Sequence, residues 1–204
     1  MSQINLANSK PINEMPKGQA SNFNLPNSIT FLRIVLIPVF IWMFSDPTPE
    51  RAFWSVLIFS GAAMTDFLDG YLARKSGQVT NLGKLLDPVA DKLLVASGLI
   101  LLVQFQRISV WLAIVLIARE LMVTGARMVA AREGLIVPAY GMGKIKVVAQ
   151  ILGILCLIAI GIWTNLDPGL LLTGNCMLYL ALAFSIWSAW GYLAFIIKKI
   201  GPQW

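Results

Sequence analysis

The chain has 204 residues, of which 57% are hydrophobic and only 13% are charged, and its mean hydropathy is +0.74. Soluble domains are usually ~45–50% apolar and ~25% charged. The composition therefore excludes disorder for most of the chain and predicts an integral membrane protein with room for roughly six membrane helices. The chain contains no histidine, which excludes a histidine base, a histidine metal ligand and a Ser-His-Asp triad within it.

A polar stretch precedes six apolar segments. Residues 1–25 are rich in Asn, Ser and Gln and are predicted to form a flexible cytoplasmic arm. Residues 26–204 are predicted to form one all-α domain, a polytopic membrane protein with six transmembrane helices. The apolar segments cover residues 29–44, 52–74, 88–105, 110–131, 145–163 and 176–197. Asp87 is suited to cap the third helix, since Pro88 is tolerated in a first helical turn.

The basic residues divide unequally between the two ends of these segments. One end has only Arg51 and Arg107, and Arg119 lies inside the fourth segment. The other end and the amino-terminal region carry Lys10, Lys17, Arg33, Arg74, Lys75, Lys84, Lys92, Arg127, Arg132, Lys144, Lys146, Lys198 and Lys199. Lys and Arg collect on the cytoplasmic side of membrane proteins. The chain is therefore predicted to lie in the cell membrane with both termini facing the cytoplasm. The net charge of +6 then reflects basic loops beside anionic lipids and not nucleic-acid binding.

Four of the ten acidic residues gather at the adjoining ends of the second and third segments. They are Asp66, Asp69, Asp87 and Asp91. Carboxylates are costly in a bilayer and there indicate a functional site. Clustered carboxylates favour hard cations such as Mg²⁺ or Mn²⁺, and two such ions can hold a pyrophosphate during an in-line phosphoryl displacement. The alternative is a structural network of ion pairs with Arg74, Lys84 and Lys92.

This region matches the signature D-x2-D-G-x2-A-R-x8-G-x3-D-x3-D at every fixed position, and so the chain resembles the CDP-alcohol phosphotransferase family. The fixed positions are Asp66, Asp69, Gly70, Ala73, Arg74, Gly83, Asp87 and Asp91. Residues 24–33, 118–127 and 143–146 add a likeness to members that use glycerol 3-phosphate. The resemblance thus covers roughly residues 24–150, with one departure at Ala126, where leucine is expected.

The resemblance implies a homodimer with a cytoplasm-facing site and two divalent cations, Mg²⁺ or Mn²⁺. It implies that glycerol 3-phosphate attacks the lipid-side phosphorus of CDP-diacylglycerol, so that phosphatidylglycerol phosphate forms and CMP leaves. Asp66, Asp69 and Asp87 would be metal ligands, and Asp91 the base for the acceptor hydroxyl, a further ligand, or both. The residues implied to line the cytidine and pyrophosphate site are Asn27, Thr30, Gly70, Ala73, Arg74 and Gly83.

A second charged group lies in and after the fourth segment. Arg119, Arg127, Lys144 and Lys146 suit a phosphorylated acceptor, because guanidinium and ammonium groups bind phosphate. For the two lysines the alternative is anchoring at the cytoplasmic interface. For Arg119 it is pairing with Glu120 or with another helix. Glu120 either orients this cluster or fixes a contact between helices.

Other functions share parts of this pattern. Within the family, the alternative acceptors are phosphatidylglycerol, as in cardiolipin synthesis, inositol phosphate and serine. A cation transporter also uses intramembrane aspartates, but it needs them along a path and not gathered at one end. A scaffold without chemistry leaves four costly aspartates without a purpose.

Overall fold

The computed structural model describes residues 25–46, 48–76, 81–132, 142–162 and 167–200, and over these residues all regular secondary structure is helical. Side chains are described for residues 30–46, 48–65, 89–130, 145–162 and 167–190. The helices are α1 (Leu25–Phe44), α2 (Pro49–Ser76), α3 (Asn81–Gln104), α4 (Val110–Arg132), α5 (Met142–Ala159), the short 3₁₀ helix η1 (Ile160–Ile162) and α6 (Pro168–Ile200). The all-α prediction is confirmed for this part of the chain.

The third helix begins earlier than its apolar segment predicts. It starts at Asn81 and not at Pro88, so Asp87 lies within α3, and the prediction that Asp87 caps this helix is wrong. A proline removes only one backbone hydrogen bond and costs about 3 kcal/mol in a helix interior, which a long packed helix can absorb. The polar first turns of α3 were missed because hydropathy marks apolar length and not the point where helical hydrogen bonding begins.

The sixth helix also begins earlier, at Pro168 and not near Cys176. Asp167 Oδ1 accepts the backbone N–H of Gly169 at 2.8 Å, which satisfies one of the unpaired donors of the first turn. Pro168 fits the first helical position, where no N–H is needed. The capping pattern therefore sets this boundary, and the polar residues that follow it belong to the helix.

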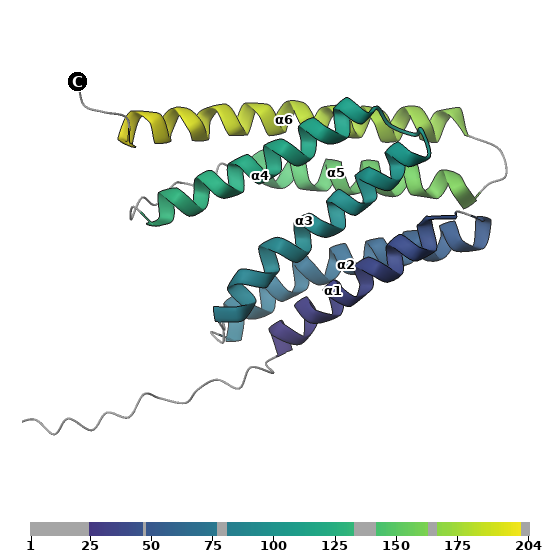
Figure 1. Cartoon of the computed structure of the whole chain (residues 1–204), viewed down its shortest axis with the longest axis horizontal. Helices are drawn as coiled ribbons and strands as arrows, with labels where there is room; N and C mark the ends of the chain where they lie inside the picture. Colours follow the sequence, from purple (N-terminus) through teal and green to yellow (C-terminus); the bar gives the residue numbers. More distant parts are fainter. Residues whose placement is uncertain (1–24, 47, 77–80, 133–141, 163–166, 201–204) are drawn as a thin grey trace, which may run out of the picture.

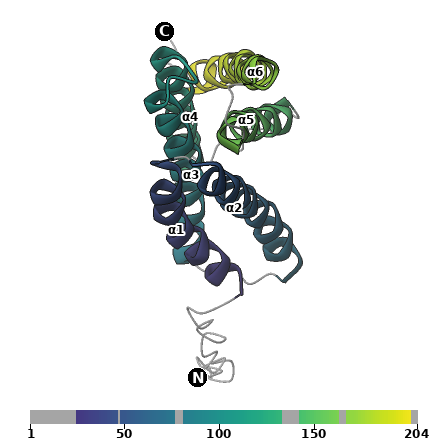
Figure 2. The ribbon, with the colours of Figure 1, turned by 90° about the vertical axis from the view of Figure 1, so that its right-hand side faces the viewer.

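The six long helices form two layers of three. Successive helices run in opposite directions, and the starts of α1, α3 and α5 lie toward the same end as the ends of α2, α4 and α6 (Figure 1). Seen from the end, α1, α3 and α4 make one layer and α2, α5 and α6 the other (Figure 2). The most extensive packing is between α5 and α6, followed by α1 against α2.

Aromatic rings fill the core between α1, α2 and the end of α3. The ring centroids of Phe40 and Phe44 are 5.8 Å apart, and Phe40 also packs against Phe59 at 5.3 Å. Phe44 meets Phe105 edge-on at 5.3 Å. Leu99, Leu102, Ile154, Leu157, Ile158 and Leu178 are fully buried and continue this core into α5 and α6.

Arg107 joins the turn between α3 and α4 to the end of α5. Its Nη1 donates to the carbonyls of Leu157 at 2.6 Å and Ile158 at 3.4 Å, and its guanidinium lies 5.5 Å from the centre of the Phe44 ring. Asn175 of α6 donates to the Arg107 carbonyl at 3.1 Å. Burial lowers the pKa of Arg107, but an arginine remains protonated in proteins. The charge therefore caps carbonyls that the end of α5 leaves without helical partners.

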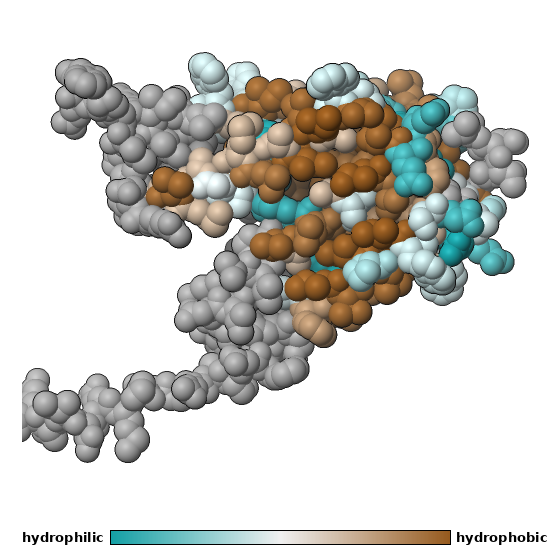
Figure 3. Space-filling view, viewed as in Figure 1, coloured by the Kyte–Doolittle hydropathy of each residue, from teal (hydrophilic) through white to brown (hydrophobic). Residues whose placement is uncertain are grey.

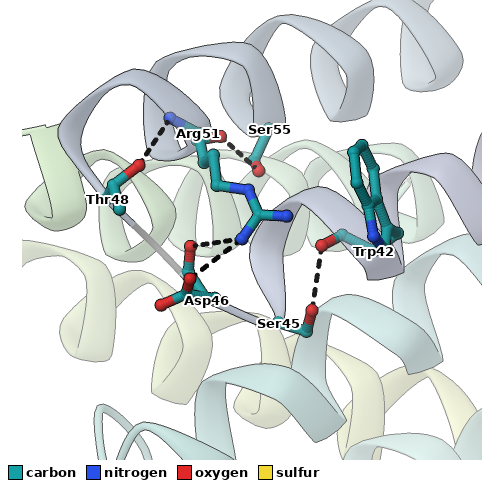
Figure 4. A network of polar contacts seen from close by, with 6 residues as sticks. All are labelled: Trp42, Ser45, Asp46, Thr48, Arg51 and Ser55. Atoms are coloured by element: carbon teal, nitrogen blue, oxygen red, sulfur yellow. Dashed lines mark hydrogen bonds and ion pairs between the residues drawn. The ribbon is translucent and has the colours of Figure 1, made fainter.

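A smaller polar network closes the turn between α1 and α2 (Figure 4). Arg51 Nη1 forms a salt bridge with Asp46 at 3.0 Å, and the guanidinium lies 4.9 Å from the Trp42 ring centre. Thr48 Oγ1 accepts the Arg51 backbone N–H at 3.4 Å. Exposed ion pairs contribute only about 0–1 kcal/mol, so this network orients the turn more than it stabilises the fold.

The surface of the described helices is strongly apolar. Ile145–Ile162 and Pro168–Trp190 are long and apolar enough to cross a membrane, with mean hydropathies of 2.5 and 1.7. Large side chains such as Trp111 and Trp187 point outward, at 74% and 73% exposure. Figure 3 shows apolar residues over the middle of the molecule and hydrophilic residues gathered at its right-hand end. These features support membrane association, whereas six spans and the orientation of the termini stay predictions.

Gly153 of α5 and Gly174 of α6 lie close together where the two helices pack. A Cβ atom added at Gly174 would lie 2.6 Å from Leu157 Cγ and 3.1 Å from the Gly153 carbonyl oxygen. Leu157 is fully buried, so it has no free space into which it can move. Small residues at such crossings let two helix backbones pack directly.

We expect Gly174→Ala to destabilise the protein by about 1–3 kcal/mol, the usual cost of overpacking a core. The matched control is Gly61→Ala on α2, where an added Cβ has no neighbour within 4 Å. This substitution should leave the stability unchanged or raise it slightly. Thermal unfolding of both variants in detergent measures the difference. Equal melting temperatures for the two variants would contradict the close α5–α6 crossing.

Candidate functional site

A cavity of about 470 Å³ lies between α3, α4 and α5, a volume typical of small-molecule sites. Its charged and polar lining residues are Asp91 and Lys92 of α3, Glu120 and Thr124 of α4, and Gln150 of α5. Apolar side chains of the same three helices form most of the remaining wall. The cavity thus offers a few polar groups within an otherwise apolar surface.

Two buried cations meet on one oxygen at the wall of this cavity. Glu120 Oε2 accepts a hydrogen bond from Arg119 Nη1 at 3.2 Å and another from Lys146 Nζ. Arg119 is 7% exposed and Lys146 is 4% exposed. Arg119 Nε also donates to the Ser185 carbonyl on α6 at 2.9 Å. Since buried charges are costly unless they are paired, this network joins α4, α5 and α6.

Local sequence spacing directs these polar groups toward the cavity. Lys146 and Gln150 are four residues apart on α5 and share one face, and both are buried. Glu120 and Thr124 have the same spacing on α4, where Thr124 Oγ1 donates to the Glu120 carbonyl at 2.8 Å. The prediction of site residues missed Gln150. Its signal was the four-residue spacing from Lys146 within an otherwise apolar segment.

The predicted carboxylate cluster is described only in part. Asp91 is half-buried and lines the cavity. Asp66 and Asp69 fall within α2, and Asp87 within α3, but their side chains lie outside the described residues. The same holds for the predicted site positions Asn27, Gly70, Ala73, Arg74, Gly83 and Lys144. Among the side chains that are described, no group of three potential metal ligands lies together.

The other predicted residues have different surroundings. Thr30 is 2% exposed, and Arg33, one helical turn later on α1, is fully buried. Arg127 is exposed on α4, although it is close enough to Arg119 for their like charges to interact. Two of the four predicted acceptor-binding cations, Arg119 and Lys146, are therefore brought together, because both pair with Glu120. Both alternatives for Arg119, pairing with Glu120 and contact with another helix, occur together.

Comparison with known proteins defines the class to which this architecture belongs. Residues 23–187 match the CDP-alcohol phosphatidyltransferase family. The match covers most of the chain, so the chain belongs to this family. The resemblance drawn from the aspartate signature is confirmed.

Three curated relatives narrow the likeness further. Each is a CDP-diacylglycerol–glycerol-3-phosphate 3-phosphatidyltransferase. The protein from Bacillus subtilis strain 168 is 41% identical over 186 residues, covering 84% of this chain and 94% of the relative. The Haemophilus influenzae protein is 37% identical over 176 residues, covering 84% and 92%. The Escherichia coli K12 protein is 35% identical over 178 residues, covering 84% and 94%.

Proposed function

We propose that this chain is an enzyme that transfers the phosphatidyl group of CDP-diacylglycerol to sn-glycerol 3-phosphate, with release of CMP. Family membership and the activity in the names of three relatives support this function. The observation that carries it is that Asp91, the last aspartate of the signature, and Glu120, which pairs with two buried cations, line one cavity. Glu120 thus shares the cavity with Asp91 and pairs with two of the cations that we propose for acceptor binding.

The proposed metal site lies where α2 ends and α3 begins. Asp66 and Asp69 lie in the carboxyl-terminal half of α2, Asp87 and Asp91 in the amino-terminal half of α3, and the two helices pack together. This all-carboxylate donor set fits hard divalent cations, Mg²⁺ or Mn²⁺, and these four residues would hold two of them. Such ions, when bound, would offset the charge that develops on the pyrophosphate.

The proposed reaction uses the chain's own groups as follows. Asp91 accepts the proton of the acceptor hydroxyl, since a carboxylate is the natural base in a chain without histidine. The hydroxyl oxygen bonds to the lipid-side phosphorus, the bond from that phosphorus to the bridging oxygen breaks, and CMP leaves with the electron pair. Arg119, Arg127, Lys144 and Lys146 hold the acceptor phosphate, and Asn27, Thr30, Gly70, Ala73, Arg74 and Gly83 line the nucleotide side.

We also propose six membrane spans with both termini in the cytoplasm. The alternating directions of six helices, the two apolar helices of membrane-crossing length and the unequal distribution of basic residues support this arrangement. The active site then faces the cytoplasm, where glycerol 3-phosphate is dissolved. The homodimer is proposed from the family resemblance.

The acceptor is tested by measuring CMP release from purified protein in detergent with CDP-diacylglycerol and Mg²⁺. Glycerol 3-phosphate, serine, inositol, inositol phosphate and phosphatidylglycerol are offered separately. We expect release with glycerol 3-phosphate alone, because the buried cations suit a phosphorylated acceptor and the names of the three relatives specify glycerol 3-phosphate. Release with phosphatidylglycerol instead would assign the chain to cardiolipin synthesis and would overturn the proposed acceptor.

Chelation tests the metal site. We expect EDTA to abolish CMP release and added Mg²⁺ or Mn²⁺ to restore it, because a carboxylate cluster without cations repels the pyrophosphate. Titration of each cation back into the chelated protein measures the requirement. Full activity in EDTA would exclude the proposed metal mechanism.

Asp91→Asn tests the role of the last signature aspartate. We expect a loss of about 10²–10⁴-fold in kcat, the usual contribution of a general base, with an unchanged melting temperature. Asp46→Asn is the matched control, because the Asp46 side chain is exposed and forms a salt bridge with Arg51 at the α1–α2 turn, away from the cavity. Substantial transfer by Asp91→Asn, or an equal loss in the control, would contradict the role of Asp91.

A further inference from the structure

We infer that Glu120 is a positioning residue that sets the affinity for the phosphorylated acceptor by holding Lys146 at the cavity wall. This inference rests on the proposed function and deepens it. Glu120 lines the cavity, and the Lys146 side chain, which is only 5% exposed, pairs with it. Because Glu120 Oε2 already accepts hydrogen bonds from Arg119 and Lys146, the geometry gives the carboxylate a role through these cations and not as a base.

The two cations depend on Glu120 to different degrees. Arg119 has a second anchor, the Ser185 carbonyl at 2.9 Å, so its guanidinium keeps a fixed contact when Glu120 is changed. Lys146 has a long flexible stem with a single charged end, and among the described side chains Glu120 is what holds that end. The substitution of Glu120 should therefore displace Lys146 more than Arg119.

The charges of Arg119, Lys146 and Glu120 also explain why a carboxylate lies beside the proposed site for the acceptor phosphate. Arg119 and Lys146 carry two positive charges, and Glu120 offsets one of them. The remaining positive charge attracts a phosphate, while neither buried cation is left without a partner. Lys92, which lines the same cavity, interacts electrostatically with both Glu120 and Lys146 and adds to the attraction.

The same cavity is lined by Glu120 and by Asp91, the proposed base. Asp91 lies on α3 and Glu120 on α4, and Lys146 of α5 pairs with Glu120. A phosphate held by Lys146 therefore determines where the acceptor hydroxyl lies relative to Asp91. Displacement of Lys146 should weaken acceptor binding and leave the CDP-diacylglycerol side unchanged.

The primary test is Glu120→Gln, which keeps the shape of the side chain and removes its charge. We expect KM for glycerol 3-phosphate to rise about tenfold, a change typical of one lost charged contact, while KM for CDP-diacylglycerol stays within about twofold. Glu120→Asp should give an intermediate KM, because the charge is kept. Glu50→Gln is the matched control, since Glu50 is exposed in the first turn of α2 and should behave as the unchanged protein.

A double-mutant cycle with Lys146→Gln separates positioning from a merely structural role. If Glu120 acts through Lys146, Glu120→Gln should change the acceptor KM by less than about twofold in the Lys146→Gln background. The double variant leaves no buried lysine without a partner. If Glu120→Gln alone does not fold, the double variant and Glu120→Asp can still be measured. Glycerol 3-phosphate should raise the melting temperature of the unchanged protein more than that of either single variant.

Several outcomes would overturn the inference. They are an unchanged acceptor KM in Glu120→Gln, an equal rise in both KM values, and effects that multiply in the double variant. Failure of the proposed function gives a different result, because the unchanged protein would then release no CMP with glycerol 3-phosphate. The control reaction of the unchanged protein therefore distinguishes the two failures.

Discussion

The contact on which the site depends is the one between Glu120 and the two buried cations, Arg119 and Lys146. Removing an ion from water costs several kcal/mol even in a relaxed protein interior, so each of these cations needs a partner. Arg119 extends the network to the Ser185 carbonyl on α6. Helices α4, α5 and α6 are thereby held in one arrangement beside the cavity. Any packing that separates α4 from α5 leaves a charge without its partner.

The position of α5 is constrained at its other end as well. Arg107 binds the carbonyls of Leu157 and Ile158 near the end of this helix, and the glycine crossing sets its approach to α6. A helix advances 1.5 Å per residue, so a one-residue shift of α5 would break the Arg107 contacts and move Lys146 along the cavity wall. The contacts at one end of the bundle thus help to place the charge at the other end.

The sequence predicted the helices well where their borders follow hydropathy and less well where they follow capping. The apolar segments located all six long helices, but α3 and α6 extend beyond them. The reason for α6 is local, since Asp167 caps a first turn that is not apolar throughout. Of the residues that the sequence predicts for the site, Asp91 lines the cavity, and Arg119 and Lys146 pair with Glu120; their roles stay predictions. The sequence prediction missed the cavity-lining Gln150, because a single polar residue in an apolar helix has no distinct pattern unless its helical neighbour is considered.

The sequence by itself determined the helical, apolar class of this protein and its family, because both depend on composition and on spacings within short stretches of chain. Only the tertiary structure showed the partners of Glu120, for which the sequence allowed either a contact between helices or the orientation of the cations: it pairs with Arg119 and, across to α5, with Lys146. Glu120 and Lys146 are 26 residues apart, and their meeting depends on how α4 and α5 are rotated and packed. Helical periodicity defines which residues share a face but not which faces meet, and here the faces that meet are those that give the buried cations a partner.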